Sequence, residues 1–418
     1  MTSVQQRARQ AAWLDLELFF GQRDAAGFYS PTRLLWGADC ADGHLRRLTE
    51  GFTGQVLVML DAALVEHRLV RALLTRLGTR AQVLTAAPLP DAVALRETAA
   101  TLDWSALAAI VAIGGGSALD SAKALLGDYL FAEGYAGIGL GSRRGEAARP
   151  ERVKPLFIAV PSTAGSGADS SRYLVTYDKR GAHWTKVHGK SWQLTADVTL
   201  LDGQLLVGAP PRVVVEPAFD AFVHACESFS CRGEANLLTR ALCREALQVI
   251  GQTLRLLLAG GALDADQATE LLVAASLAGT AISNARTGHV HEAGGAALEW
   301  LEGVSHAQTL WLFLREGLQQ TAASETGRAQ QAELARTMGF ATFAEVLDGW
   351  QELLGRAGSR AQLAAALARL AASGNLTAAQ AAVVDRVLAD RVWCDKECPV
   401  PLGAEQAWRL AACLEQQP

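Results

Sequence analysis

The sequence has few aromatic residues and no apolar run long enough to cross a membrane. Aromatic side chains make up 6% of the 418 residues. No uninterrupted apolar stretch approaches the roughly 20 residues that span a bilayer. The first residues have no apolar core after a basic start, so we expect no signal peptide and a cytoplasmic location. The lack of a long apolar run argues against a membrane-spanning protein.

Cysteine is also sparse, with seven residues that are scattered along the chain. An odd, irregularly spaced set argues against a disulfide framework. Cys394 and Cys398 are four residues apart and could bind zinc. No second cysteine pair with zinc-site spacing accompanies them, so we favour free thiols.

An excess of positive charge is missing as well. The chain has 38 basic and 43 acidic residues and no basic patch, which argues against nucleic acid as the main partner. Half of the residues are hydrophobic and 19% are charged, so the chain has enough apolar side chains for large cores. Its length allows two domains.

The first half of the chain alternates short buried strands with helical segments. After an N-terminal extension, 1–27, this pattern predicts an α/β dinucleotide-binding domain over 28–209. Continuous aliphatic runs suit parallel strands that are covered on both faces, so we expect an open, mostly parallel sheet. The expected strands are 33–37, 54–61, 81–85, 109–113, 156–160, 174–178 and 198–202.

The second half has almost no strand signals. Ala- and Leu-rich helical patterns dominate from residue 212 onward, as in 235–259 and 361–372. The Gly208–Pro211 segment is the best boundary between the two halves. We therefore expect an all-helical, metal-binding domain over 210–418.

Three consecutive glycines follow the strand expected at 109–113. A turn of Gly114, Gly115 and Gly116 lets the backbone approach a pyrophosphate, and the N–H groups of the following helix face the anion. Ser117 and Asp120 lie in the first turns of that helix. A tight turn without a ligand is the alternative, and we favour phosphate binding.

A second loop of small residues follows the strand expected at 156–160. Its hydroxyl and N–H groups, including those of Ser162, Thr163 and Ser166, could hold ribose or phosphate. An ordinary surface loop is the alternative.

Asp220 and His224 are four residues apart, so on a helix their side chains leave the same face. A carboxylate and an imidazole in this arrangement can hold a divalent metal ion. The pair alone is weak evidence, because such pairs also occur on solvated helix faces. His291 and His306 lie in a Gly-rich segment downstream and could bring two more ligands.

Several motifs in the right order resemble the iron-dependent (group III) alcohol dehydrogenases of the dehydroquinate synthase-like superfamily. The segment 114–123 resembles the family signature GGGSxxDxAK, and 161–167 is similar to its PTTAGTG loop. Ala168 and Asp169 stand where the family usually has Ser and Glu. The further resemblances are at 197–202 with 210–211, at 218–227, at 288–291 and at 305–306.

The resemblance implies NAD and a divalent metal, Fe²⁺ or Zn²⁺, bound between the two domains, and we expect a homodimer. Asp61 matches the acid that reads the adenosine ribose, which favours NAD over NADP. The implied metal and catalytic residues are Asp220, His224, His291 and His306. The implied cofactor neighbours are Gly114, Gly115, Gly116, Ser117, Asp120, Ser162, Thr163, Ser166 and Lys186.

One position departs from the family. A second histidine usually follows the ligand that matches His291 by four residues, and Gly295 stands there in this chain. That histidine lies near the substrate in the family and can serve proton transfer. Another donor such as His289 or a water would have to take its place, or the ordinary alcohol reaction is lost. Without an imidazole at 295 we expect slow turnover of simple alcohols such as ethanol.

The function that we favour is the NAD-linked interconversion of a small alcohol and a carbonyl. Three alternatives stay open. The first is a dehydroquinate synthase-like cyclase, although that group has Glu where this chain has Asp220. The second is a tailoring dehydrogenase of natural-product (daptide-type peptide) biosynthesis, which would oxidise and decarboxylate a β-hydroxy acid. The third is a degenerate member that only binds nucleotide, and the four retained ligands argue against it.

Overall fold

The computed structural model describes residues 27–131, 134–135, 151–180, 183–231, 235–389 and 403–416. Nearly all of the N-terminal extension and the pair Cys394 and Cys398 lie outside the described residues. No helix among the described residues combines the length and apolar character that crossing a membrane requires.

The first half of the chain forms a six-stranded sheet in which all neighbouring strands are parallel. The strand order is β1-β8-β5-β4-β2-β3. The bounds of these strands are β1 Arg33–Trp36, β2 Gln55–Asp61, β3 Ala81–Ala86, β4 Leu107–Gly114, β5 Leu156–Pro161 and β8 Val198–Leu201. The predicted open parallel sheet is confirmed.

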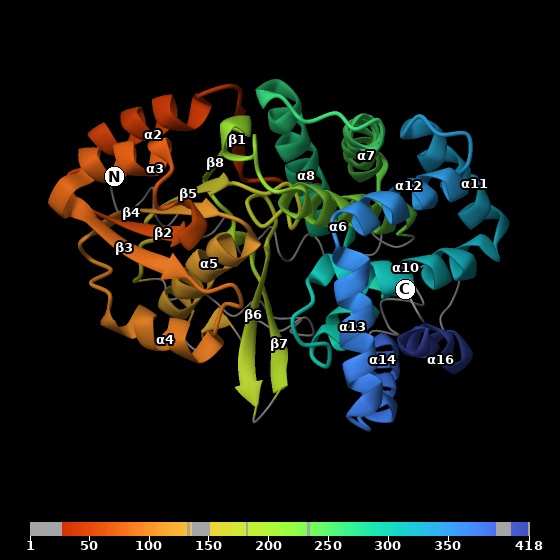
Figure 1. Cartoon of the computed structure of the whole chain (residues 1–418). Helices are drawn as coiled ribbons and strands as arrows, with labels where there is room; N and C mark the ends of the chain where they lie inside the picture. The colour runs from red at the N-terminus through yellow and green to blue at the C-terminus, as the bar shows by residue number, and fades with distance from the viewer. Residues whose placement is uncertain are drawn as a thin grey trace.

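Helices cover both faces of this sheet (Figure 1). Val56 and Val58 of β2 belong to a core with α2 (Cys40–Glu50) and α3 (Arg68–Leu77). The alternate residues Leu57 and Met59 face the core formed with α4 (Ala92–Thr101) and α5 (Gly116–Leu130). This alternation explains why the strands have continuous apolar sequences.

One strand of the first half, β7 (His183–Lys190), was not predicted. It pairs antiparallel with β6 (Tyr173–Arg180), and the two form a separate sheet. The strand expected at 174–178 therefore does not join the parallel sheet. The β7 segment is rich in polar residues and has no regular apolar alternation, so it gave no strand signal. The hairpin extends along the boundary between the sheet and the helical half (Figure 1).

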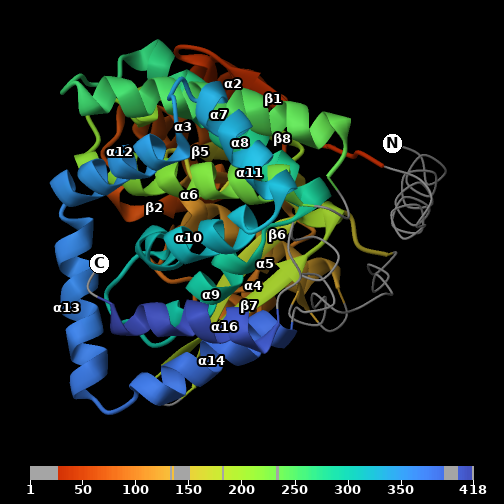
Figure 2. The same cartoon turned by 90° about the vertical axis from the view of Figure 1, so that its right-hand side faces the viewer.

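The second half is helical throughout its described residues, as expected (Figure 2). Its core surrounds α6 and includes the buried rings of Phe219, Phe222, Phe313 and Trp350. The bounds are α6 Pro211–Ser230, α7 Leu237–Leu258, α8 Ala265–Ala285, α9 His289–Leu298, α10 His306–Ala322, α11 Glu325–Thr337, α12 Phe343–Arg356, α13 Ser359–Ala372, α14 Leu376–Ala389 and α16 Ala404–Ala411.

The loop after β5 joins the two halves. A Cβ atom at Gly165 would lie 2.7 Å from the Cβ of Pro217 in α6. Gly167 has a φ of +59°, and a Cβ there would lie 2.4 Å from the Cα of Gly279 in α8. Only glycine permits this close backbone approach. The loop that should contact the cofactor is therefore packed directly against the helix that carries Asp220 and His224.

Candidate metal and cofactor site

The carboxyl ends of β2, β4 and β5 meet at one edge of the sheet. Asp61 ends β2, and its carboxylate accepts a hydrogen bond from the Ala63 N–H at 2.9 Å. Ser162, directly after β5, donates its N–H to the Gly114 carbonyl at 3.0 Å. Ligands of open α/β sheets bind at this edge. Three of the predicted cofactor residues therefore lie together where a dinucleotide is expected.

The glycine turn packs against the second loop with no room for side chains. Gly114 has a φ of +152°, and a Cβ there would lie 2.8 Å from the Cβ atoms of Asp61 and Ala118. A Cβ at Gly115 would lie 3.1 Å from Thr163 Oγ1, and one at Gly116 would lie 2.9 Å from Ser166 Oγ.

The two loops therefore form one small-residue surface at the N-terminus of α5. The backbone N–H groups at such a helix start favour an anion. This geometry supports a diphosphate position between the turn and the second loop.

The polar residues that follow the turn form hydrogen bonds within the protein. Ser117 Oγ donates to the Pro88 carbonyl at 2.7 Å. Asp120 Oδ2 accepts from the Val175 N–H at 3.1 Å. Burial raises the pKa of Asp120 to about 6, against the opposing charge of Lys123. Lys123 Nζ donates to two main-chain carbonyls at the start of the β6 hairpin, so its role is structural.

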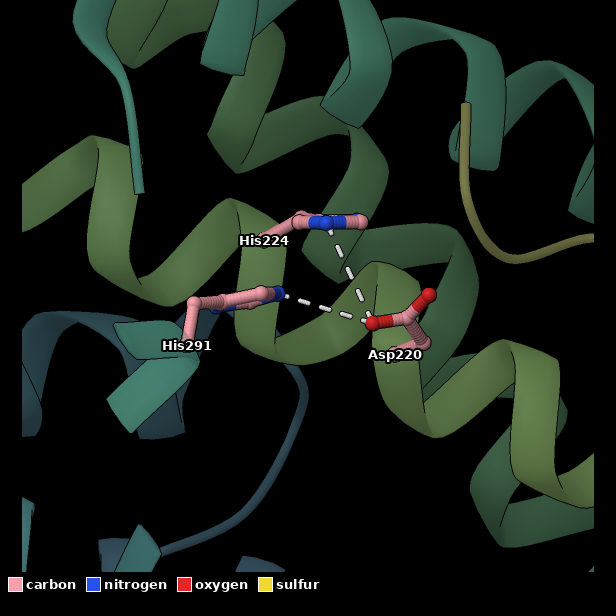
Figure 3. A group of neighbouring side chains, drawn as sticks. All are labelled: Asp220, His224 and His291. Carbon is pink, nitrogen blue, oxygen red and sulfur yellow. Dashed lines mark ion pairs between the residues drawn. The ribbon is translucent and has the colours of Figure 1, made fainter. Parts of the chain in front are cut away.

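Three of the predicted metal-binding residues converge from two helices (Figure 3). Asp220 and His224 lie one turn apart on α6, and His291 comes from the first turn of α9. Asp220 Oδ1 is 3.9 Å from His224 Nε2 and 3.5 Å from His291 Nε2. One ligand atom from each of the three residues lies within 4.8 Å of the other two. The predicted i,i+4 pair therefore lies on one helix face with a third ligand opposite.

His306, the first residue of α10, lies beside this group but outside the 4.8 Å set. Its ring is edge-on to that of His291, with centroids 5.5 Å apart. Asp220 Oδ1, His291 Nε2 and His306 Nδ1 are buried without a hydrogen-bond partner among the described residues. One carboxylate and three imidazoles suit Fe²⁺ or Zn²⁺. The residues present therefore fit a divalent metal ion.

The protonation states also suit metal binding at three of these residues. Burial acts to raise the pKa of Asp220, but the surrounding imidazoles, His224 first, hold it well below its usual value. Burial lowers the pKa of His224 to about 4. Burial and the charge of Lys186 hold the pKa of His306 far below its usual value. An ionised carboxylate and neutral imidazoles are the forms that bind a metal.

Glu227 fixes the orientation of His291. Its Oε2 lies 2.5 Å from His291 Nδ1 and accepts from the Gly288 N–H at 2.8 Å, and its Oε1 accepts from the Val290 N–H at 2.9 Å. Burial opposes the effect, but Glu227 and Asp220 together raise the pKa of His291 to about 9. A carboxylate behind a ligating histidine orients the ring and strengthens it as a ligand. Glu227 is not among the residues predicted from the sequence, although the spacing 220, 224 and 227 places all three on one helix face.

We expect the Glu227→Gln variant to bind the metal more weakly by about 10–100-fold, because the amide no longer supplies a negative charge to His291. Titration with Zn²⁺ against a competing chelator measures the affinity. Glu216→Gln is the matched control, because Glu216 is a buried acid of the same helix that contacts Arg212, Gln308 and Ser359 instead. Equal metal affinity in the Glu227 variant and in the wild type would contradict the role.

One cavity of about 690 Å³ connects the predicted metal-binding residues with the glycine turn. Lys186 of β7 lines the same cavity. The predicted residues in its wall are Gly116, Ser117, Asp120, Ser166, Lys186, Asp220, His224, His291 and His306. Asp61, Gly114, Gly115, Ser162 and Thr163 stand at the sheet edge beside it rather than in its wall.

We expect the protein to bind NADH more tightly than NADPH, because a carboxylate at position 61 accepts from a ribose 2′-hydroxyl and repels a 2′-phosphate. The Asp61→Asn variant should lower the ratio of NADH affinity to NADPH affinity by roughly tenfold or more, since each 1.4 kcal/mol changes an affinity tenfold. Asparagine keeps an oxygen for the Ala63 N–H, so the local turn is preserved. Fluorescence titration with both cofactors measures the ratio, and tighter NADPH binding by the wild type would refute the assignment.

The fold and the site define a class: a protein with a dinucleotide-type parallel sheet in its first half and a helical second half that carries a candidate metal site. Two family models match the chain. "Iron-containing alcohol dehydrogenase" matches residues 31–203, and "Fe-containing alcohol dehydrogenase family, C-terminal" matches residues 214–391. The chain belongs to the iron-containing alcohol dehydrogenase family. It is a family of oxidoreductases whose curated members include alcohol dehydrogenases and aldehyde reductases.

Similar proteins include enzymes with different named substrates. Sulfoacetaldehyde reductase of Bilophila wadsworthia is 35% identical over 192 residues, which are 44% of this chain and 45% of that protein. The probable alcohol dehydrogenase EutG of Salmonella typhimurium is 29% identical over 351 residues, 79% of this chain and 86% of that protein. A solved structure of sulfoacetaldehyde reductase from Bifidobacterium kashiwanohense, in complex with NAD+, has a TM-score of 0.75. It is 18% identical and covers 94% of this chain and 100% of that one.

Proposed function

We propose that the protein is an NAD-dependent, metal-dependent alcohol dehydrogenase that interconverts a small alcohol and its aldehyde or ketone. The observation that carries this proposal is the convergence of Asp220, His224 and His291 on a cavity that also reaches the glycine turn. Family membership and the names of the relatives support the same reaction class.

The residues of the chain would form two sites, one for the metal and one for the cofactor diphosphate. Asp220, His224, His291 and His306 would hold the metal, which acts as a Lewis acid that polarises the substrate oxygen. Glu227 keeps the His291 ring in place. The turn and the second loop would hold the cofactor diphosphate, and the bound cofactor would supply the hydride.

A small carbonyl compound is the substrate class that we propose. The names of two relatives support this class: one is a sulfoacetaldehyde reductase and the other is a probable alcohol dehydrogenase. No observation in the described residues favours the cyclase or the peptide-tailoring alternative. The homodimer and the cytoplasmic location stay predictions.

The proposed activity is tested with purified protein loaded with Fe²⁺ or Zn²⁺, NADH and a panel of short aldehydes with neutral and anionic substituents. We expect aldehyde-dependent oxidation of NADH, followed by absorbance, which stops when a chelator removes the metal. Absence of oxidation with every aldehyde, while NADH and metal both bind, would refute the dehydrogenase assignment.

A further inference from the structure

Position 295 and Lys186 lie next to each other in the wall of the cavity. Gly295 lies on α9 one turn after His291, so both residues share a helix face, and both line the cavity. A Cβ atom at position 295 would lie 3.4 Å from Lys186 Nζ and 3.6 Å from its Cδ. The end of the Lys186 side chain is therefore in van der Waals contact with the point from which a side chain at position 295 would extend.

The strand that carries Lys186 is anchored to the helical half. Lys186 pairs with Tyr177 in the β6–β7 hairpin, and its N–H donates to Glu299 Oε1 at 3.2 Å. The same Glu299 oxygen accepts from Arg386 of α14 at 3.1 Å. These contacts hold the backbone of Lys186 near the end of α9. From there the long side chain reaches position 295 on the same helix.

Lys186 is surrounded by charged groups from several elements. Burial lowers the pKa of its ammonium group, Glu292 opposes this, and Arg386 adds to it. A lysine in this setting gives up its proton more readily than an exposed one. The titratable and charged groups around it are Asp120 on α5, Asp220 on α6, Glu292 on α9, Glu299 directly after α9, His306 on α10, Arg386 on α14 and His188 on β7.

Other proton donors in the cavity are less suitable. The Nε2 atom of His289 lies against α10, because a Cβ at Gly317 would be only 2.8 Å from it. Burial, Lys186 and Arg386 together hold the pKa of His188 far below its usual value, so this imidazole is neutral near pH 7 and is a very weak acid. Burial raises the pKa of the Tyr177 phenol, which makes it a weaker acid.

We propose that Lys186 is the acid–base residue of this chain and takes the place that an imidazole at position 295 would have. This inference rests on the proposed dehydrogenase function. In carbonyl reduction a hydride from NADH adds to the carbonyl carbon. The proton leaves Lys186 Nζ as its N–H bond breaks and the alcohol O–H bond forms. The neutral amine then takes a proton from water, and oxidation of the alcohol runs the same steps in reverse. Gly295 therefore does not by itself imply slow turnover.

The test compares Lys186→Met with the double variant Lys186→Met/Gly295→His. We expect Lys186→Met to lower kcat for aldehyde reduction by about 100-fold or more, the usual contribution of a general acid. Metal content by elemental analysis should stay at the wild-type value. NADH affinity is measured by fluorescence, because the family resemblance implies that Lys186 also contacts the cofactor, and kcat at saturating NADH then separates the two roles. The histidine at position 295 should restore at least roughly tenfold of the lost rate. Lys186→Met/Gly295→Ala is the matched control for adding a side chain, and we expect no rescue in it.

The pH profile separates an acid–base role from a structural one. The general acid must be protonated for reduction, so the rate falls as pH rises through its pKa. We expect this fall in the rescued double variant at lower pH than in the wild type, near the ordinary histidine value of about 6.5.

Three results would overturn the inference. One is a Lys186→Met variant that keeps its kcat, and another is a loss explained wholly by weaker NADH binding, which would assign Lys186 to the cofactor. The third is equal restoration of the rate by alanine and by histidine at position 295. A wild type that binds NADH and metal but reduces no carbonyl compound would instead overturn the proposed function, and this inference with it.

Discussion

The His224→Ala and His306→Ala proteins should each lose their bound metal and their turnover together. A Lewis acid at the substrate oxygen contributes several kcal/mol to the transition state. Because 1.36 kcal/mol corresponds to a factor of ten, we expect kcat to fall by roughly 10³-fold in each variant.

The physical reason is the geometry of the donor atoms. His224 is stacked on His291, with ring centroids 4.5 Å apart, and its Nε2 faces Asp220 Oδ1. Removing His224 leaves an incomplete coordination sphere around a buried carboxylate. His306 approaches from α10, on a different side of the His291 ring. The loss expected in His306→Ala therefore also tests whether the fourth residue completes the set when metal is bound.

Elemental analysis of the purified proteins and steady-state kinetics with NADH measure the two losses. His44→Ala is the control, because His44 lies on α2 in the other half of the chain. Circular dichroism checks that each variant is folded. Full metal occupancy in a folded His306→Ala protein would remove His306 from the ligand set, and the same result for His224 would remove that residue.

Much of the parallel sheet was predictable because each strand has a distinctive local sequence. The run Val56–Leu60 is buried on both faces and contains only aliphatic residues and Met59. Such a run indicates a covered parallel strand. The glycine turn and the pair Asp220 and His224 are also local patterns, in which spacing alone fixes the relative position of the residues. The structure places these residues in the predicted elements.

The β6–β7 hairpin could not be predicted in the same way. Thr185, Lys186 and His188 are polar. Lys186 and His188 line the cavity, and the Lys186 N–H donates to Glu299 just after α9. β-Structure of this kind depends on its surroundings more than on its own sequence. The meeting of Lys186 with position 295 therefore arises from tertiary packing between two distant segments.

The neighbourhood of His291 shows a similar limit. Residues 220, 224 and 227 share a helix face, so Glu227 was within reach of a spacing argument. Its second and third contacts are the main-chain N–H groups of Gly288 and Val290, which are positioned by the turn that starts α9. The geometry of that turn cannot be deduced from residue spacing.

The Gly115→Val protein should bind NADH at least about tenfold more weakly while keeping its metal, the change in affinity that 1.4 kcal/mol produces. A Cβ at position 115 would already lie 3.1 Å from Thr163 Oγ1, and the two methyl groups of valine extend further into the surface between the loops. Either the Thr163 loop moves or the diphosphate loses its close approach to the backbone.

The metal should remain, because its residues come from α6, α9 and α10 rather than from the turn. Fluorescence titration with NADH and elemental analysis measure the two properties on the same sample. Gly43→Val is the matched control, because Gly43 on α2 has no positive φ and nothing within 4 Å of an added Cβ. A folded Gly115→Val protein with unchanged NADH affinity would show that the turn does not contact the cofactor. Loss of the metal together with NADH would instead point to a disturbance that the tightly packed second loop transmits to α6.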